Sequence, residues 1–197
     1  MVKYLLLFHG YNQNKETMEK KINKLIPKKI LNCYSVISVS GSYKIGENLN
    51  TFGWWRLETP MNFTKPGIYE NYHKAIDNVK TQLSNINKTD SVSIIAFSQG
   101  TVIVEIMLAL ELFSFIPKKV LLVSPSGIMD KNIKVNKISN IEILATFGKL
   151  EKTFRICPEH YECWTAFKNY KTYVHDKGHV IPSRSCDKKV IFDFLFN

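Results

Sequence analysis

Ser98 has the surroundings that a nucleophilic serine needs. It lies in the stretch AFSQG, directly after an apolar run and before an apolar helical pattern. A serine between small residues on a strand-to-helix turn is typical of the nucleophile elbow, G-x-S-x-G. Ala96 replaces the first glycine and Gly100 keeps the second, so the motif is weakened without being broken. The alternative is a structural role, because serine is also a common helix N-cap.

His179 is the candidate for the base that would activate this serine. It follows the last apolar run by four residues, in the stretch KGHVIP, where Gly178 and Pro182 favour a loop. His175 is the alternative, but it falls inside the apolar run, where we expect its side chain to be packed. We therefore predict that His179 accepts the proton of the serine hydroxyl.

Glu151 is the candidate for the acid that orients the base. It lies between the serine and the histidine in chain order, in a turn with Gly148 after the penultimate apolar run. A glutamate can orient an imidazole as an aspartate does, with one more methylene to place. Asp176 and Glu142 are weaker candidates, and a solvent-exposed glutamate between lysines is the structural alternative.

Two backbone N–H groups are candidates for stabilising a developing oxyanion. The N–H of Gln99 follows the serine at a helix N-terminus, where unpaired N–H groups favour negative charge. The N–H of Tyr11 follows a His9-Gly10 turn after the first apolar run. His9 itself is expected to be a structural hydrogen-bonding residue.

Alternating strand and helix patterns must position these groups. Runs rich in Val, Ile and Leu predict six strands, over 2–8, 34–40, 91–97, 119–124, 141–147 and 170–175. Helical patterns cover 15–29 (broken at Pro27), 68–86, 100–115 and 187–196. Such alternation predicts an α/β fold, a doubly wound, mostly parallel sheet with helices on both faces. Functional groups then gather at the carboxyl ends of the strands.

The long connection over 41–67 shows no clear helix or strand pattern and is rich in aromatic residues. Loops of this length are uncommon in compact domains and are often functional. Phe52, Trp54, Trp55 and Met61 are expected to form an apolar wall for an acyl chain, with plain packing as the alternative. No insertion is long enough to form a large lid domain.

Length and composition predict one globular domain over 1–197. With 45% hydrophobic residues and no apolar run of membrane-spanning length, we expect a cytoplasmic protein without stable membrane insertion, a monomer or homodimer. The net charge of +10 comes from 24 Lys against 3 Arg spread along the whole chain. Dispersed lysine indicates a solvated surface, so no nucleic-acid partner is expected.

The four cysteines predict neither a metal site nor a defined disulfide. Cys157, His160 and Cys163 lie together in CPEHYEC, but this spacing matches no common zinc pattern. All four cysteines, including Cys33 and Cys186, are expected to be free thiols, and a disulfide pairing is left open. No metal or cofactor is predicted.

Five stretches together resemble the FSH-type family of serine hydrolases. They are LFHGYNQN (7–14), FGWWRLE (52–58), IAFSQGT (95–101), FGKLEKTF (147–154) and KGHVIPS (177–183). The resemblance extends from the first strand to the last helix and implies a compact α/β-hydrolase fold. It also implies Ser98, His179 and Glu151 as a catalytic triad, and Tyr11 and Gln99 as oxyanion donors.

Three residues depart from the pattern of that family. Ala96 replaces the elbow glycine, Glu151 replaces the usual aspartate, and Lys177 replaces a glycine in the loop that carries His179. The elbow sequence is shared with acyl-protein thioesterases and carboxylesterases, whereas the HGYNQN stretch favours the FSH type. Because the side chain of Glu151 is longer, the position of its carboxylate is the feature of the triad that a structure must test.

The resemblance implies a carboxylic ester or thioester hydrolase that works through an acyl-enzyme. Because no insertion is long enough for a large lid, we expect small or single-chain acyl groups as substrates. One alternative is an acyl-protein thioesterase-like or lysophospholipase activity. A catalytically weak ligand-binding member of the fold is another, because the acid departs from the family pattern.

Overall fold

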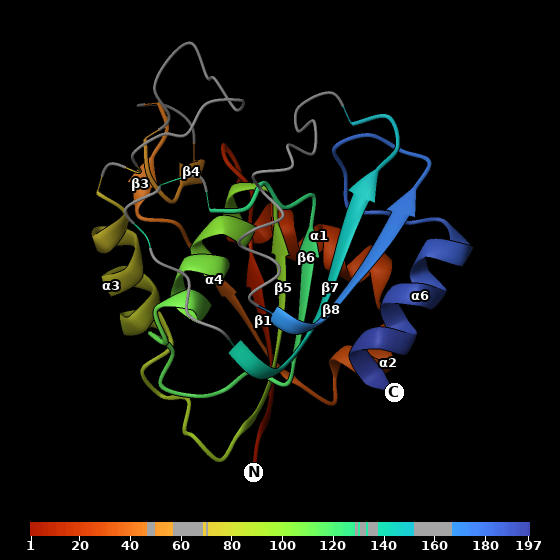
Figure 1. Ribbon diagram of the computed structural model, residues 1–197, viewed down its shortest axis with the longest axis horizontal. Coiled ribbons are helices and arrows are strands. Elements are labelled where there is room, and N and C mark those ends of the chain that lie inside the picture. The colour runs from red at the N-terminus through yellow and green to blue at the C-terminus, as the bar shows by residue number, and fades with distance from the viewer. Residues whose placement is uncertain are drawn as a thin grey trace.

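Six parallel strands form the central sheet of the protein. The computed structural model describes residues 1–46, 50–56, 69, 71–128, 130, 133, 138–151 and 167–197 (Figure 1). The strands are β1 (Lys3–Phe8), β2 (Ser35–Val39), β5 (Ser91–Phe97), β6 (Lys119–Val123), β7 (Ile138–Gly148) and β8 (Phe167–His175). Their order across the sheet is β2-β1-β5-β6-β7-β8, and every neighbouring pair is parallel. This confirms the six predicted strands and their parallel arrangement.

The path of the chain across the sheet reverses between β1 and β5. From β1 the chain crosses to β2 on one side, and it later returns past β1 to continue outward from β5 to β8. In an open parallel sheet, such a reversal leaves a crevice at the carboxyl ends of the two central strands. Tyr11 follows β1 and Ser98 follows β5, so both lie at this crevice.

Helices cover both faces of the sheet (Figure 1). On one face lie α1 (Lys15–Leu25) and α6 (Ser185–Phe196), and on the other α3 (Tyr72–Gln82) and α4 (Gln99–Ala109). The short α2 (Lys28–Leu31) follows the break at Pro27. Because side chains alternate along a strand, Leu5 and Leu7 of β1 pack in the core on the α1 and α6 side, and Leu6 and Phe8 in the other.

Two helices are shorter than their apolar patterns predict. The pattern over 100–115 continues past the observed end of α4 because the chain there packs in the core without being helical, and Phe115 remains buried. Glu111 has a positive φ of 53°, a conformation that ends a right-handed helix. In the same way, Asn71, with a φ of 59°, delays the start of α3 until Tyr72. Apolar periodicity therefore extends over buried residues that lie beyond the ends of the helices.

The connection over 41–67 contains a small second sheet in its described part. β3 (Tyr43–Lys44) pairs with β4 (Phe52–Gly53) in antiparallel fashion, and Phe52 also exchanges backbone hydrogen bonds with Gln13. The described residues form no separate lid domain, and none of their helices is both long and apolar enough to cross a bilayer.

Gly100 allows α4 to approach β1 closely. All residues of α4 are buried, which places this helix against the centre of the sheet. A Cβ atom on Gly100 would lie 2.5 Å from the carbonyl oxygen of His9 and 2.7 Å from that of Phe8. Backbone atoms cannot yield as a flexible side chain can, so this position requires glycine.

We expect Gly100→Ala to lower the free energy of unfolding by about 2 kcal/mol or more, because overpacking a dense core commonly costs this much. Urea denaturation monitored by circular dichroism measures the change. The matched variant is Ala96→Gly, which restores the elbow glycine and should cost only about 1 kcal/mol. Equal losses in the two variants would show that the approach of α4 to β1 is not limited by Gly100.

Candidate active site

Ser98 occupies a strained turn between β5 and α4. Its φ of 53° and ψ of −124° are unusual for a residue with a side chain, and such strain is typical of functional sites. Its N–H donates to the carbonyl oxygen of Val123 (2.9 Å), and the N–H and hydroxyl of Thr101 donate to its carbonyl oxygen (2.8 and 2.7 Å). The Ser98 side chain makes no capping hydrogen bond to α4. The N-cap alternative therefore does not describe this hydroxyl group.

A hydrogen-bonded chain links Ser98, His179 and Glu151. The Ser98 Oγ lies 2.8 Å from His179 Nε2, and His179 Nδ1 is hydrogen-bonded to Glu151 Oε1. The Glu151 side chain is only 4% exposed, against 26% for His179. With a carboxylate at Nδ1, that nitrogen carries the proton of a neutral imidazole, so Nε2 can accept the serine proton. The structure thus brings together the three residues that the sequence singles out.

Backbone contacts hold the turn after β7 against the loop after β8. The N–H of Lys149 donates to the carbonyl oxygen of His175 (2.7 Å), and that of Leu150 to the carbonyl oxygen of Lys177 (3.0 Å). A Cβ atom on Gly148 would lie 2.4 Å from the same Lys177 oxygen, so the turn requires glycine there. These contacts hold the turn that carries Glu151 beside the segment that leads to His179.

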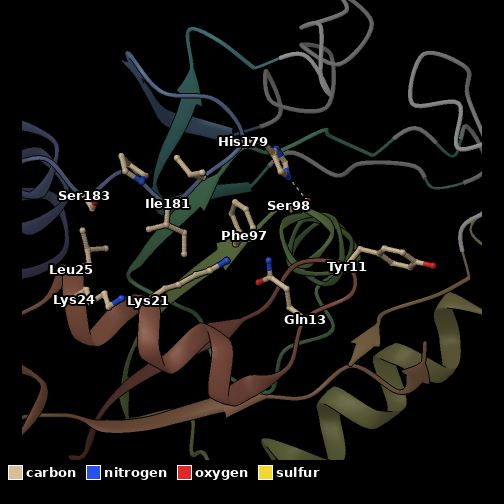
Figure 2. A pocket seen from close by; sticks show the side chains of 12 residues that line it. Tyr11, Gln13, Lys21, Lys24, Leu25, Phe97, Ser98, His179, Ile181 and Ser183 are labelled. Carbon is tan, nitrogen blue, oxygen red and sulfur yellow. Dashed lines mark hydrogen bonds between the residues drawn. The ribbon is translucent and has the colours of Figure 1, made fainter. Parts of the chain in front are cut away.

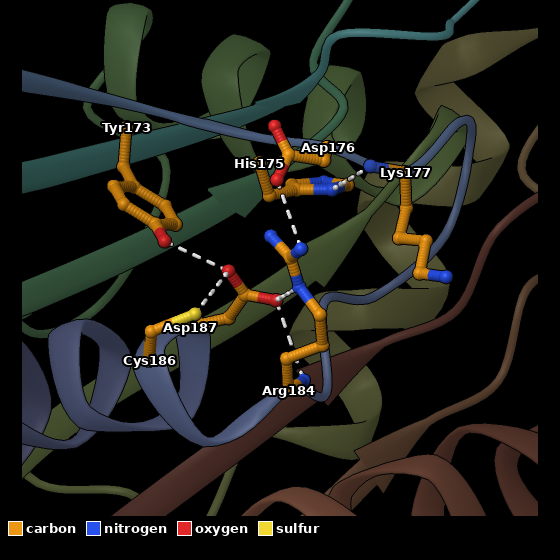
Figure 3. Close-up of polar contacts among 7 residues, drawn as sticks. All are labelled: Tyr173, His175, Asp176, Lys177, Arg184, Cys186 and Asp187. Carbon is orange, nitrogen blue, oxygen red and sulfur yellow. Dashed lines mark hydrogen bonds and ion pairs between the residues drawn. The ribbon is translucent and has the colours of Figure 1, made fainter.

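A second polar network holds the C-terminal end of the base loop, which is the loop over 176–184 that carries His179 between β8 and α6 (Figure 3). Arg184 donates from Nη1 to Asp176 (2.9 Å) and from Nε to Asp187 (3.3 Å), and the Tyr173 hydroxyl donates to Asp187 (2.7 Å). Burial raises the pKa of Asp187, but the hydrogen bonds from Tyr173 and Arg184 outweigh it and hold this pKa below its usual value. The ionised Asp187 thus joins β8, the base loop and α6.

The weaker sequence candidates lie outside the triad. Asp176 is exposed and pairs with Arg184. Glu142 is exposed and aligned with Lys119, at the opposite end of the sheet from Ser98. His175 is buried, as the sequence indicates, and its Nδ1 accepts the N–H of Lys177 (3.2 Å). Burial lowers the pKa of His175, which keeps it neutral.

His9 supports the site as a structural residue. Its Nε2 accepts the N–H of Gly41 (2.9 Å), so the ring proton lies on Nδ1 and is donated to the carbonyl oxygen of Gly10 (2.8 Å). The indole N–H of Trp54 donates to the carbonyl oxygen of His9 (2.9 Å), and the two rings stack with centroids 5.1 Å apart. Burial lowers the pKa of His9.

The Trp54–Trp55 pair does not form the wall that the sequence predicts, because both indoles are buried in the core. The side chain of Gln99 holds this segment: Trp54 N–H donates to Gln99 Oε1 (2.9 Å), and Gln99 Nε2 donates to the carbonyl oxygen of Trp55 (3.2 Å). Phe52 is half-buried in β4, and Met61 lies outside the described residues. The packing alternative therefore holds for the two tryptophans.

The residues that carry the two candidate oxyanion donors lie at the same cleft as Ser98 or directly after it in the chain. Gln99 is the first residue of α4, so its backbone N–H has no acceptor within the helix. A Cβ atom on Gly10 would lie 3.1 Å from the Cβ of Ser98, which shows how closely the chain before Tyr11 passes the serine. Tyr11 also lines the same cleft as Ser98.

A cleft of about 280 Å³ opens beside Ser98 and His179 (Figure 2). One side is formed by Lys21, Lys24 and Leu25 of α1, and another by the base loop over 180–183. Sequence reasoning missed the α1 side. The spacing of these three residues, which places them on one helical face, is the signal that could have indicated it.

We expect His9→Gln to flatten the loss of stability at acidic pH. The unfolded chain protonates His9 near pH 6.5, whereas the folded pKa is lower, so its stabilising contribution is complete above 6.5 and lost as the pH falls below it. Gln keeps an acceptor for Gly41 but cannot titrate. Unfolding free energies at about pH 7.5 and about pH 5.5 measure the effect. His73→Gln, on the exposed face of α3, is the control and should retain the wild-type slope.

Several solved structures share this fold. YahD, solved with malic acid, has a TM-score of 0.72 at 11% identity, covering 98% of this chain and 94% of that one. A carboxylesterase from Mesorhizobium loti has a TM-score of 0.68 at 14% identity, covering 98% and 88%. The Bacillus cereus carboxylesterase has a TM-score of 0.64 at 17% identity, covering 98% and 87%. These similarities confirm the predicted α/β-hydrolase fold.

No curated protein matches the chain in sequence. The model of one protein family, described as serine hydrolase (FSH1), matches residues 1–191, from the first strand into the last helix. The chain therefore belongs to the FSH1 family of serine hydrolases.

Proposed function

We propose that this protein hydrolyses carboxylic esters or thioesters of small or single-chain acyl groups through an acyl-enzyme on Ser98. The observation that carries the proposal is the continuous hydrogen-bonded chain from the serine through His179 to the buried Glu151. A solvent-exposed or misplaced acid would have favoured a ligand-binding member of the fold. Family membership supports the coarser statement, hydrolysis at a serine.

In the proposed acylation step, His179 Nε2 takes the hydroxyl proton as Ser98 Oγ attacks the carbonyl carbon. Glu151 holds the imidazole in place and stabilises its positive charge without taking a proton. The N–H groups of Tyr11 and Gln99 would stabilise the oxyanion, and each such donor is commonly worth about 3 kcal/mol. The imidazolium then protonates the leaving alcohol or thiol as the tetrahedral intermediate collapses.

In the deacylation step, a water molecule replaces the leaving group. His179 accepts a proton from this water while the water oxygen attacks the acyl carbon. The same proton is then transferred to Ser98 as the ester bond to the enzyme breaks. The products are a carboxylic acid and the free serine. This sequence uses only residues of the chain and water.

The dimensions of the cleft support small or single-chain acyl groups. A volume of about 280 Å³ lies just below the usual range for small-molecule sites, about 300 to 1,000 Å³. Its walls combine the apolar side chains of Leu25, Phe97 and Ile181 with polar groups near the serine. An extended acyl chain can lie along such walls, whereas a bulky branched group would leave the cleft.

We expect Glu151→Gln to slow the labelling of Ser98 by a fluorophosphonate probe by about 100-fold or more, because loss of the carboxylate removes the correct imidazole tautomer. Intact-mass spectrometry over time measures the rate. Glu142→Gln is the matched control and should be labelled at the wild-type rate, since Glu142 lies at the other end of the sheet. Equal rates in both variants would remove Glu151 from the mechanism.

We expect the wild-type protein to hydrolyse p-nitrophenyl esters with the highest kcat/KM for short acyl chains, in a series from acetyl to palmitoyl. Ser98→Ala should lose about 10⁴-fold or more in kcat, because the nucleophile is absent. Equal hydrolysis by wild type and Ser98→Ala would contradict the acyl-enzyme. A maximum at palmitoyl would contradict the preference for short chains that we infer from the cleft volume of about 280 Å³.

A further inference from the structure

We propose that the substrate carries a free carboxylate group, and that Lys21 binds this group in the cleft beside Ser98. The inference rests on the proposed ester hydrolysis and narrows it to one substrate class. The carboxylate can belong to the acyl part, as in a half-ester of a dicarboxylic acid, or to the leaving group. Both sources present the same chemistry to a lysine.

The placement of Lys21 follows from the geometry of α1. Residues three and four apart lie on one face of a helix, and Lys21, Lys24 and Leu25 have this spacing and all line the cleft. Leu25 is buried and Lys24 is exposed, with Lys21 half-buried between these extremes. The helix therefore presents an apolar base and a charged side to the bound molecule.

Lys21 lies near the reacting atoms. Its Nζ is 4.7 Å from the ring centroid of Phe97, the residue that precedes Ser98, and the same ring lies 5.1 Å from the imidazole of His179 (Figure 2). The ammonium group of Lys21 and the imidazole of His179 therefore both lie close to the ring of Phe97. A substrate that extends from the serine across this ring reaches the ammonium group within a short aliphatic chain.

Among the described residues, no carboxylate forms an ion pair with Lys21. Partial burial lowers its pKa by removing water from the ammonium group, and the Phe97 ring replaces only part of that solvation. A carboxylate in the cleft would supply a charge-assisted hydrogen bond, which is about twice as strong as a neutral one.

This environment separates Lys21 from the other lysines of a chain with a net charge of +10. A solvated surface lysine keeps its water and needs no partner. Lys24, at the same cleft, adds a second positive charge that attracts an anion without having to contact it. Two positive charges therefore lie at the cleft that contains Ser98, whereas the other lysines are dispersed along the chain.

The test compares charged and neutral substrates of the same size. For the acyl side, p-nitrophenyl hydrogen glutarate is compared with p-nitrophenyl valerate, and for the leaving group, 4-acetoxybenzoate is compared with its methyl ester. Each pair gives a ratio of kcat/KM, charged over neutral. We expect the wild-type protein to favour the charged member of at least one pair, and Lys21→Met to reduce that ratio by about 10- to 100-fold. Lys21→Arg should keep most of it.

Lys20→Met is the matched control, because Lys20 is exposed on the same helix and does not line the cleft. It should retain the wild-type ratio. Wild-type ratios near one in both pairs, or equal ratios in Lys21→Met and Lys20→Met, would overturn the role of Lys21. Failure of the hydrolysis itself would appear separately, as neutral esters that the wild type and Ser98→Ala hydrolyse equally.

Discussion

The positive φ at Ser98 is the constraint on which the rest of the site depends. It turns the chain so sharply that the hydroxyl group stands clear of α4 and faces His179. The helix that follows this turn, α4, packs close to the end of β1, and this approach requires the absence of a side chain at Gly100. A strained residue persists where the surrounding structure holds it. Here the hydrogen bonds of the Ser98 backbone to β6 and to Thr101 do so.

The other two members of the triad are positioned by contacts between loops. The turn that carries Glu151 is hydrogen-bonded through its backbone to the segment that leads to His179, which holds the carboxylate beside the imidazole. The network around Asp187 anchors the same loop to α6. A buried carboxylate is unfavourable without such partners. One oxygen of the Glu151 carboxylate is hydrogen-bonded to His179 Nδ1, and the other accepts the N–H of Gly148.

Much of this arrangement follows from the sequence because it depends on local rules. Apolar runs identify the six strands, and parallel order brings Ser98, Glu151 and His179 to the same edge of the sheet. The role of the tryptophans could not be predicted in this way, because burial of Trp54 depends on partners distant in sequence, His9 and Gln99. Lys21 was missed for the same reason. Its significance comes from a cleft that exists only after α1 packs beside the base loop.

In a catalytic triad, Glu151 acts through His179 and has no separate role. A double-mutant cycle in ester hydrolysis measures this coupling directly, with His179→Ala, Glu151→Ala and the double variant compared by kcat. Residues that act as a unit are strongly non-additive. We expect the double variant to be no slower than His179→Ala alone, within about 2-fold. If the two losses multiply in the double variant, Glu151 and His179 act independently and do not form a triad with Ser98.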